Sequence, residues 1–275
     1  MLIHVRHSTR YGYEPEALKL ALRIMLYPGT HGGQFAQNWQ VTADGETVLK
    51  LHDDSAGNGV GLWFRHAPSD GVEIIAEGVI ETSDTAGVIR NGQDHTRPEI
   101  WLRQTTLTRP DDDIRALAEQ VPGEDALSRL HALSAAVNEA VTYRQETTDS
   151  ATTAAEALSR GTGVCQDQTH VFLAAARHVG LPARYVAGYL LVDALDEAVV
   201  PETETHAWAE AHVAGLGWVG FDPTHMVSPT EAYVRMTCGL DASEAAPIRG
   251  NVLGEATETL DVNLAITQAS GQSQQ

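Results

Sequence analysis

The sequence predicts an α+β protein that begins with an antiparallel, sandwich-like β unit. Three observations lead to this fold class. Residues 1–105 contain short apolar or alternating runs that turn formers separate, as in antiparallel strands. From about residue 111, apolar side chains recur at helical spacing, and residues 206–224 have the pattern of a β-hairpin. With 275 residues, the chain is long enough for one large domain or two.

Strands are expected at the N-terminus, where residues alternate between apolar and polar, and in four later runs, at 41–42, 48–51, 60–64 and 72–80. Turn formers at 43–45 and 53–59 separate these runs. The stretch 82–110 is polar and rich in Gly, Thr and Arg, which predicts a connector.

Three helices are expected before the first cysteine. One follows the acidic residues 111–113, a second spans about 124–141, and a third spans 151–160 and ends at glycines. Near the C-terminus, residues 259–266 predict a final strand, and the polar end 268–275 is expected to be frayed.

The composition is that of a globular, acidic protein. Hydrophobic residues make up 43% of the chain, and 37 acidic against 18 basic residues give a net charge of −19. A charge this negative argues against nucleic acids and anionic membranes as partners, and weakly favours a neutral or basic substrate.

The chain has no sequence feature of a secreted or membrane protein. Its two cysteines, Cys165 and Cys238, are too few for a disulfide framework and suit a reducing compartment. The N-terminus lacks the apolar core of a signal peptide, and no stretch reaches the ~18–20 apolar residues of a membrane span. We therefore expect a cytoplasmic protein.

Cys165 is expected at the N-terminus of a fourth helix. Glycines precede it, helix formers follow it, and Gly180 and Pro182 form a stop signal. The free N–H groups and partial positive charge of a helix N-terminus stabilise a thiolate, which makes such a cysteine nucleophilic. The alternative is an ordinary buried cysteine, which is common.

His206 and Asp222 lie on the two strands of the predicted hairpin. Folding the hairpin about 214–216 brings Asp222 opposite residues 206–210, so the two side chains can be direct or diagonal neighbours. An imidazole can take the proton of a thiol and return it to a leaving group, while a carboxylate fixes its tautomer. Taken singly, His206 also fits a hydrogen-bonded strand residue, and Asp222 a turn residue.

Four segments, 163–167, 180–189, 206–210 and 217–224, follow one another in an order that resembles the transglutaminase-like superfamily of papain-type cysteine enzymes. The resemblance implies a catalytic triad of Cys165, His206 and Asp222. Segments of the first half and of the tail are similar to bacterial members of this superfamily, at 7–13, 54–58, 73–81 and 246–250.

The resemblance also implies a domain plan. An N-terminal β domain is expected over 1–105, and a catalytic core, with helices packed on an antiparallel sheet, over 106–240. A C-terminal strand and a flexible tail are expected over 241–275.

The activity implied is cysteine-dependent acyl transfer at peptide or amide bonds through a thioester, more hydrolytic than crosslinking. No cofactor or metal is expected, and the expected partner is a peptide or protein substrate. Two alternatives stay open: a protein-glutamine transglutaminase or amide ligase, and a non-catalytic peptide-binding module on the same fold. The sequence leaves the oligomeric state open.

Residues near the triad have further expected roles. Asp167 is expected to point away from Cys165, because a negative charge opposes thiolate formation. The backbone N–H of Cys165 is the simplest oxyanion donor, and Tyr143 and Gln145 are candidates for a second donor.

Other residues near the triad fit either functional or structural roles. Trp208 and Trp218 are expected to be packing residues. His212 and His225 lack the compact spacing of zinc ligands, so we expect no metal site. The acidic segment 194–205 is a candidate lid.

Overall fold

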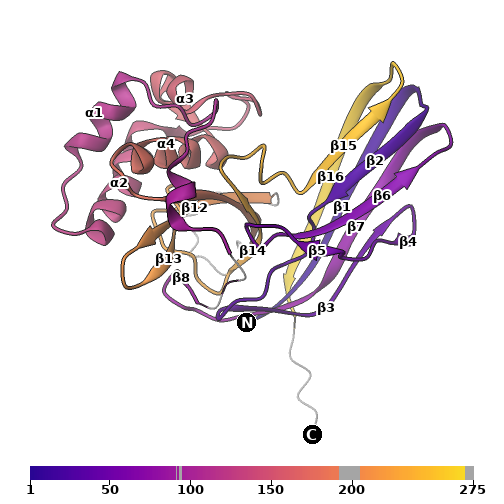
Figure 1. Cartoon of the computed structure of the whole chain (residues 1–275), viewed down its shortest axis with the longest axis horizontal. Coiled ribbons are helices and arrows are strands. Elements are labelled where there is room, and N and C mark those ends of the chain that lie inside the picture. The colour runs from indigo at the N-terminus through magenta and orange to yellow at the C-terminus, as the bar shows by residue number, and fades with distance from the viewer. Residues whose placement is uncertain (91, 93–94, 192–204, 270–275) are drawn as a thin grey trace, which may run out of the picture.

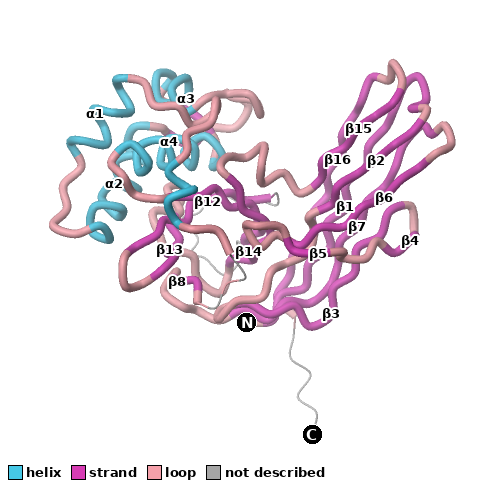
Figure 2. The backbone as a smooth tube through the Cα atoms, viewed as in Figure 1, coloured by secondary structure: helices cyan, strands magenta, loops and turns pink. Residues whose placement is uncertain are grey.

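The computed structural model describes residues 1–90, 92, 95–191 and 205–269, and has two parts that lie side by side (Figure 1). One part consists of strands, and the other places helices over a second group of strands (Figure 2). This arrangement confirms the predicted α+β class. Within the described ranges, no helix combines the length and apolar character that crossing a membrane requires.

The first part is a sandwich of two antiparallel sheets. One sheet has the order β16-β1-β7-β3-β4, formed by β16 (Thr257–Gln268), β1 (Leu2–Ala17), β7 (Ser69–Thr82), β3 (Gln34–Ala43) and β4 (Glu46–Thr47). The other has the order β15-β2-β6-β5, formed by β15 (Ile248–Leu253), β2 (Lys19–Ile24), β6 (Gly59–Arg65) and β5 (His52–Asp53). Alternating side chains of β1 and β2, such as Ile3, Val5 and Leu22, fill the core between the sheets.

The C-terminal strands complete this sandwich. β16 pairs with β1 from Ile3↔Gln268 to Glu14↔Thr257, and β15 pairs with β2. The strand predicted over 259–266 is therefore confirmed, and the chain returns to its own beginning after passing through the helical part.

The strand predicted over 48–51 is wrong. There the chain crosses from β4 in one sheet to β5 in the other, so it cannot run along either sheet. Leu49 and Leu51 are 70% and 59% exposed, while Val48 is buried and its N–H donates to Val41 O at 2.8 Å.

The second part has four helices in the described ranges, at the predicted places. They are α1 (Asp112–Gln120), α2 (Ala126–Ala140), α3 (Ala154–Arg160) and α4 (Cys165–His178). Three of them start at caps visible in the sequence: Asp111 and Asp125 accept backbone N–H groups, and Thr153 forms a capping box with Glu156.

These helices cover an antiparallel sheet of the order β14-β11-β12-β13-β8 (Figure 1). Its strands are β14 (Tyr233–Gly239), β11 (Ala183–Leu190), β12 (Thr205–Val213), β13 (Gly217–Phe221) and β8 (Val88–Ile89). α2 and α4 rest on the sheet, while α1 and α3 pack against α4. The expected connector over 82–110 therefore also supplies an edge strand, and a 3-10 helix, η1 (Pro98–Leu102).

α4 is the centre of this part. Every residue from Asp167 to Arg177 is buried, so the helix is enclosed on all sides rather than on one face. Near the C-terminal end of α4, the guanidinium of Arg177 donates hydrogen bonds to Ala183 O, Thr108 Oγ1 and Leu240 O, at 2.7–3.0 Å. The position of the first residue of α4 is therefore set by the core itself.

Candidate active site

Cys165 is the first residue of α4, as predicted, and it is partly exposed. The short strand β10 (Thr162–Gly163) leads into it and pairs in parallel with β9 (Thr142–Tyr143). The first N–H groups of a helix have no carbonyl partner within the helix, so they point toward the region of the thiol. The other cysteine, Cys238, is 1% exposed and donates to Ala56 O.

Asp167 forms hydrogen bonds with residues near the start of α4. Its Oδ2 accepts the N–H of Val164 at 2.8 Å and the hydroxyl of Thr148 at 2.6 Å. A Cβ on Gly163 would lie 2.7 Å from the Cβ of Asp167, so the glycine before the cysteine makes room for this carboxyl group. Burial raises the pKa of Asp167, and the two hydrogen bonds act in the opposite direction.

His206 lies at the start of β12 and meets Asp222 just after β13. The register Ala209↔Phe221 places Asp222 across from residue 208, diagonal to His206, as the hairpin predicted. His206 Nε2 and Asp222 Oδ2 are 2.7 Å apart, and both side chains are fully buried.

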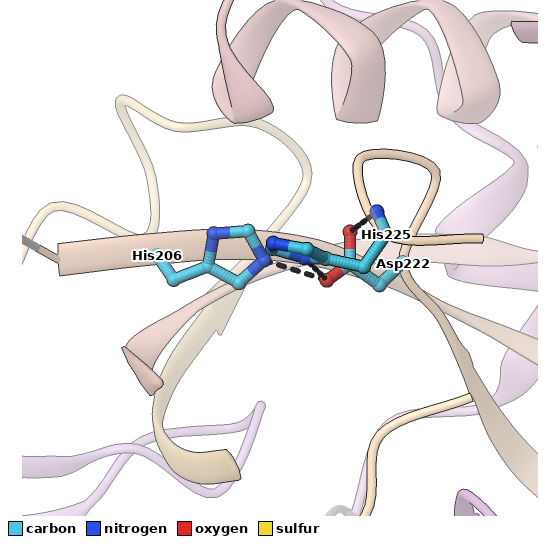
Figure 3. A group of neighbouring side chains, drawn as sticks. All are labelled: His206, Asp222 and His225. Carbon is cyan, nitrogen blue, oxygen red and sulfur yellow. Dashed lines mark hydrogen bonds and ion pairs between the residues drawn. The ribbon is translucent and has the colours of Figure 1, made fainter. Parts of the chain in front are cut away.

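The carboxylate of Asp222 is surrounded by donors (Figure 3). Oδ2 accepts from His206 Nε2 and His225 Nδ1, each at 2.7 Å, and from Tyr233 OH at 2.8 Å. Oδ1 accepts the backbone N–H groups of Thr224 and His225, at 2.9 and 3.3 Å. Burial by itself raises the pKa of Asp222, but His206 and His225 outweigh it through charge and hydrogen bonds and hold that pKa well below its usual range.

This network assigns the tautomer of His206. A carboxylate only accepts hydrogen bonds, so the proton of the neutral imidazole lies on Nε2. Nδ1, on the ring edge away from Asp222, is then the basic nitrogen. A histidine in this state can accept a proton from a thiol.

The same residues also have the atom types of metal ligands. Ligand atoms of His206, Asp222 and His225 all lie within 4.8 Å of one another. Two ligands of a tetrahedral zinc ion at ~2.1 Å stand ~3.4 Å apart. The observed separations of 2.7 Å from Oδ2 to each histidine nitrogen match charge-assisted hydrogen bonds instead.

Cys165 and His206 line one cavity of about 430 Å³. Tyr143, Gln145 and Gln166 line it too, so both candidates for a second oxyanion donor are at the site. Trp208 and Trp218 are absent from the described lining; Trp208 packs on Tyr233 and Trp218 under Arg184, in agreement with their predicted packing role. Of the candidate lid at 194–205, only Thr205 is within the described residues, and it also lines the cavity.

Two family models match parts of this chain. Residues 115–223 match the transglutaminase-like superfamily, a range that includes Cys165, His206 and Asp222. The core is transglutaminase-like. Residues 3–81 match the bacterial transglutaminase-like N-terminal region, which corresponds to most of the sandwich.

Three proteins are similar to this transglutaminase-like chain at 20–36% identity. An uncharacterized protein of Mycobacterium leprae is 28% identical over 278 residues, covering 97% of this chain and 98% of that protein. A protein-glutamine γ-glutamyltransferase of Pseudomonas aeruginosa is 36% identical over 70 residues, 24% of this chain and 10% of that protein. Among solved structures, a candidate cysteine protease from Cytophaga hutchinsonii is similar over 99% of this chain and 92% of its own, with a TM-score of 0.74 and 20% identity.

Two features of the transglutaminase-like core were missed by the sequence reasoning. His225 was considered only as a metal ligand, although its spacing of three residues from Asp222 across a turn was a usable signal for a side-chain contact. Glu210, two positions beyond Trp208 on β12, binds Arg184 Nε at 2.6 Å and Arg235 Nε at 2.7 Å. Burial opposes ionisation of Glu210, but the two guanidinium groups outweigh it and lower its pKa to about 2.

Proposed function

We propose that this protein is a cysteine-dependent acyl-transfer enzyme that acts on peptide or amide bonds, with Cys165, His206 and Asp222 as its catalytic residues. One observation carries the proposal. A cysteine at the start of a buried helix shares a cavity with a histidine whose far nitrogen is bonded to a buried carboxylate. Each group thereby has the environment that nucleophilic catalysis by a thiol requires.

The first half-reaction forms a thioester. Sγ of Cys165 gives its proton to Nδ1 of His206 and attacks the carbonyl carbon of the amide. The bond between Sγ and carbon forms, the carbon–nitrogen bond breaks, and the imidazolium returns the proton to the departing amine. Asp222 stabilises the imidazolium in between, and the N–H of Cys165 is placed to stabilise the oxyanion.

The second half-reaction depends on the acceptor. Water gives a proton to Nδ1 of His206 while its oxygen bonds to the thioester carbon. The carbon–sulfur bond then breaks, the imidazolium returns the proton to Sγ of Cys165, and the acyl group leaves as a carboxylic acid, which is hydrolysis. A primary amine does the same and yields a new amide, which is transglutamination or ligation. We favour hydrolysis, as the resemblance to bacterial members implies. The γ-glutamyltransferase of P. aeruginosa, matched over 70 residues, represents the other outcome.

The acceptor can be identified in one experiment. The protein is incubated with a diverse peptide mixture and a labelled primary amine in heavy-oxygen water, and the products are read by mass spectrometry. Heavy oxygen at new C-termini or at Gln side chains identifies a hydrolase, whereas labelled amine on Gln side chains identifies a transglutaminase.

The controls are matched substitutions. Cys165→Ala should abolish both products and leave the fold intact, whereas Cys238→Ala should retain them. His206→Ala should be nearly as inactive as Cys165→Ala, and Asp222→Ala should leave a little activity. Full activity in the Cys165→Ala protein contradicts the proposal, and silence of the wild type in both channels favours a non-catalytic peptide-binding module.

A further inference from the structure

We infer that the inner end of the active-site cavity binds a neutral, apolar side chain of the acyl donor, and that the N-terminal sandwich supplies part of this subsite. The inference rests on the proposed function and names the substrate class of the same site. It is carried by the difference between the mouth of the cavity and its inner wall.

The mouth is polar and the inner wall is enclosed. Gln145, Glu146 and Thr205 line the cavity and are exposed to solvent. Leu26, Tyr189 and Met236 line the same cavity but are only 1–3% exposed. A group that reaches them leaves bulk water behind, which favours apolar groups and opposes charged ones.

The polar atoms of His7 and Tyr189 at the inner wall are already bonded within the protein. His7 Nδ1 lies 2.7 Å from Tyr189 OH, and His7 Nε2 lies 3.1 Å from Thr9 Oγ1. Burial lowers the pKa of His7 to about 4, so the ring is neutral at pH 7. The pair therefore keeps its hydrogen-bonding groups occupied.

The inner wall also offers no counter-ion. Among the described residues that line the cavity, there is no lysine or arginine, and the one carboxylate outside the triad belongs to Glu146 at the exposed mouth. A lysine or glutamate side chain of a substrate would have to enter without a partner. Sites of this kind discriminate strongly against charge.

Two parts of the fold build the wall. Tyr189 and Met236 come from β11 and β14 of the transglutaminase-like core. His7 comes from β1, and Leu26 follows β2, where Met25 N–H donates to Pro247 O at 2.6 Å and ties the end of β2 to the returning chain. The sandwich is thus part of the substrate site rather than a separate module.

The test uses full-length Cys165→Ala protein and measures binding, which needs no turnover. The probes are acetylated dipeptide amides that differ only in the residue X that provides the acyl group: Leu, Phe, Met, Lys or Glu. We expect the dissociation constants for Leu, Phe and Met, measured by calorimetry, to be at least tenfold lower than those for Lys and Glu. Equal dissociation constants across the series, or binding of none of the five, overturn the inference.

Substitutions locate the subsite. Leu26→Ala and Met236→Ala should each reduce the preference for Leu over Lys at least threefold. Leu22→Ala is the matched control, because Leu22 is buried in the sandwich core and does not line the cavity. An unchanged preference in both Leu26→Ala and Met236→Ala, or an equal loss in Leu22→Ala, overturns the assignment to this wall.

The proposed function is checked separately in the wild-type protein by the rate at which iodoacetamide alkylates Cys165. An unreactive Cys165 with a clear apolar preference refutes the catalytic mechanism and keeps the subsite. A reactive Cys165 with no preference refutes the subsite alone.

Discussion

Replacing Asp222 by asparagine should be more damaging than the near-identity of the two side chains suggests. Five donors converge on the carboxylate: two imidazole nitrogens, one phenol and two backbone N–H groups. An amide has one oxygen and one NH₂ group, so a donor faces other donors in either orientation. Because backbone N–H groups cannot adapt, the oxygen must turn to them and the NH₂ group to His206, His225 and Tyr233.

The expected cost follows from these contacts. Both imidazoles must move a proton to the other nitrogen, and the charge that stabilised three side-chain donors is gone. A hydrogen bond to a charged group contributes about 1.5–3 kcal/mol and one between neutral groups about 1 kcal/mol, so weakening three of them costs about 3–5 kcal/mol in total. For a chain of this size, 1 kcal/mol corresponds to ~2 °C, so the melting temperature should fall by roughly 6–10 °C.

The chemical effect is separate from the stability effect. In the Asp222→Asn protein His206 carries its proton on Nδ1, so it can no longer accept the proton of the thiol. The rate at which iodoacetamide alkylates Cys165 at pH 7 should therefore fall roughly tenfold or more. Nitrogen chemical shifts of the His206 ring report the tautomer directly.

Two comparisons complete the experiment. Tyr233→Phe removes one donor and keeps the charge, so it should cost only about 1–2 kcal/mol and leave the tautomer of His206 unchanged. Asp84→Asn, in an exposed loop, should have no effect on either measurement. An Asp222→Asn protein that is as stable as the wild type, and in which His206 keeps its proton on Nε2, would contradict this prediction.

Four further predictions follow from single residues. At neutral pH the partly exposed Cys165 should be alkylated much faster than the buried Cys238, as peptide mass spectrometry would show; equal, slow labelling contradicts the site. Burial lowers the pKa of His170 from 6.5 to about 4, so this residue costs no stability above pH 6.5. As the pH falls to 4, its contribution should lower the free energy of unfolding by about 3 kcal/mol. Urea titrations of the wild type and of His170→Gln should therefore diverge between pH 6.5 and 4, and parallel curves would contradict this role. The pKa of Glu210 is lowered from 4.5 to about 2, so its ion pairs stabilise the fold above pH 4.5 and this contribution is lost toward pH 2. In Glu210→Gln the free energy of unfolding should therefore depend less on pH between 4.5 and 2. A slope equal to that of the wild type contradicts the ion-pair role. In Gly188→Ala a Cβ would overlap a backbone carbonyl of β14, so the variant should fail to fold, and a native circular dichroism spectrum would contradict the packing.

Local signals were enough to predict the helices and the three catalytic candidates. A cap acts within one turn of its helix, so the acidic residues 111–113 marked the start of the first helix without knowledge of the fold. The hairpin likewise restricts His206 and Asp222 to nearby positions, because only a short loop separates the two strands. The prediction of Cys165 at a helix start used glycines directly before it.

Long-range pairings could not be predicted in the same way. The partner of β1 is β16, more than 240 residues later, and nothing in either strand specifies the other. Glu210 was visible as a strand residue, but its two arginines lie on other strands, so the ion cluster depends on the order of the sheet. The failed strand at 48–51 has the same origin, since an apolar run does not reveal that its chain changes sheets.

The buried titratable groups suggest an order in which acid acts on this protein. Glu210 keeps its charge to low pH because two guanidinium groups stabilise it, and Asp222 does so because His206 and His225 bond to it. His7 and His170 are held neutral by burial, and each has a pKa of about 4, so protonating them costs stability as soon as the pH falls below 6.5. His7 also holds the inner wall of the cavity through Tyr189. Acid should therefore loosen the junction between sandwich and core before it discharges either carboxylate, which makes loss of substrate binding the earlier event and loss of the Asp222 charge the later one.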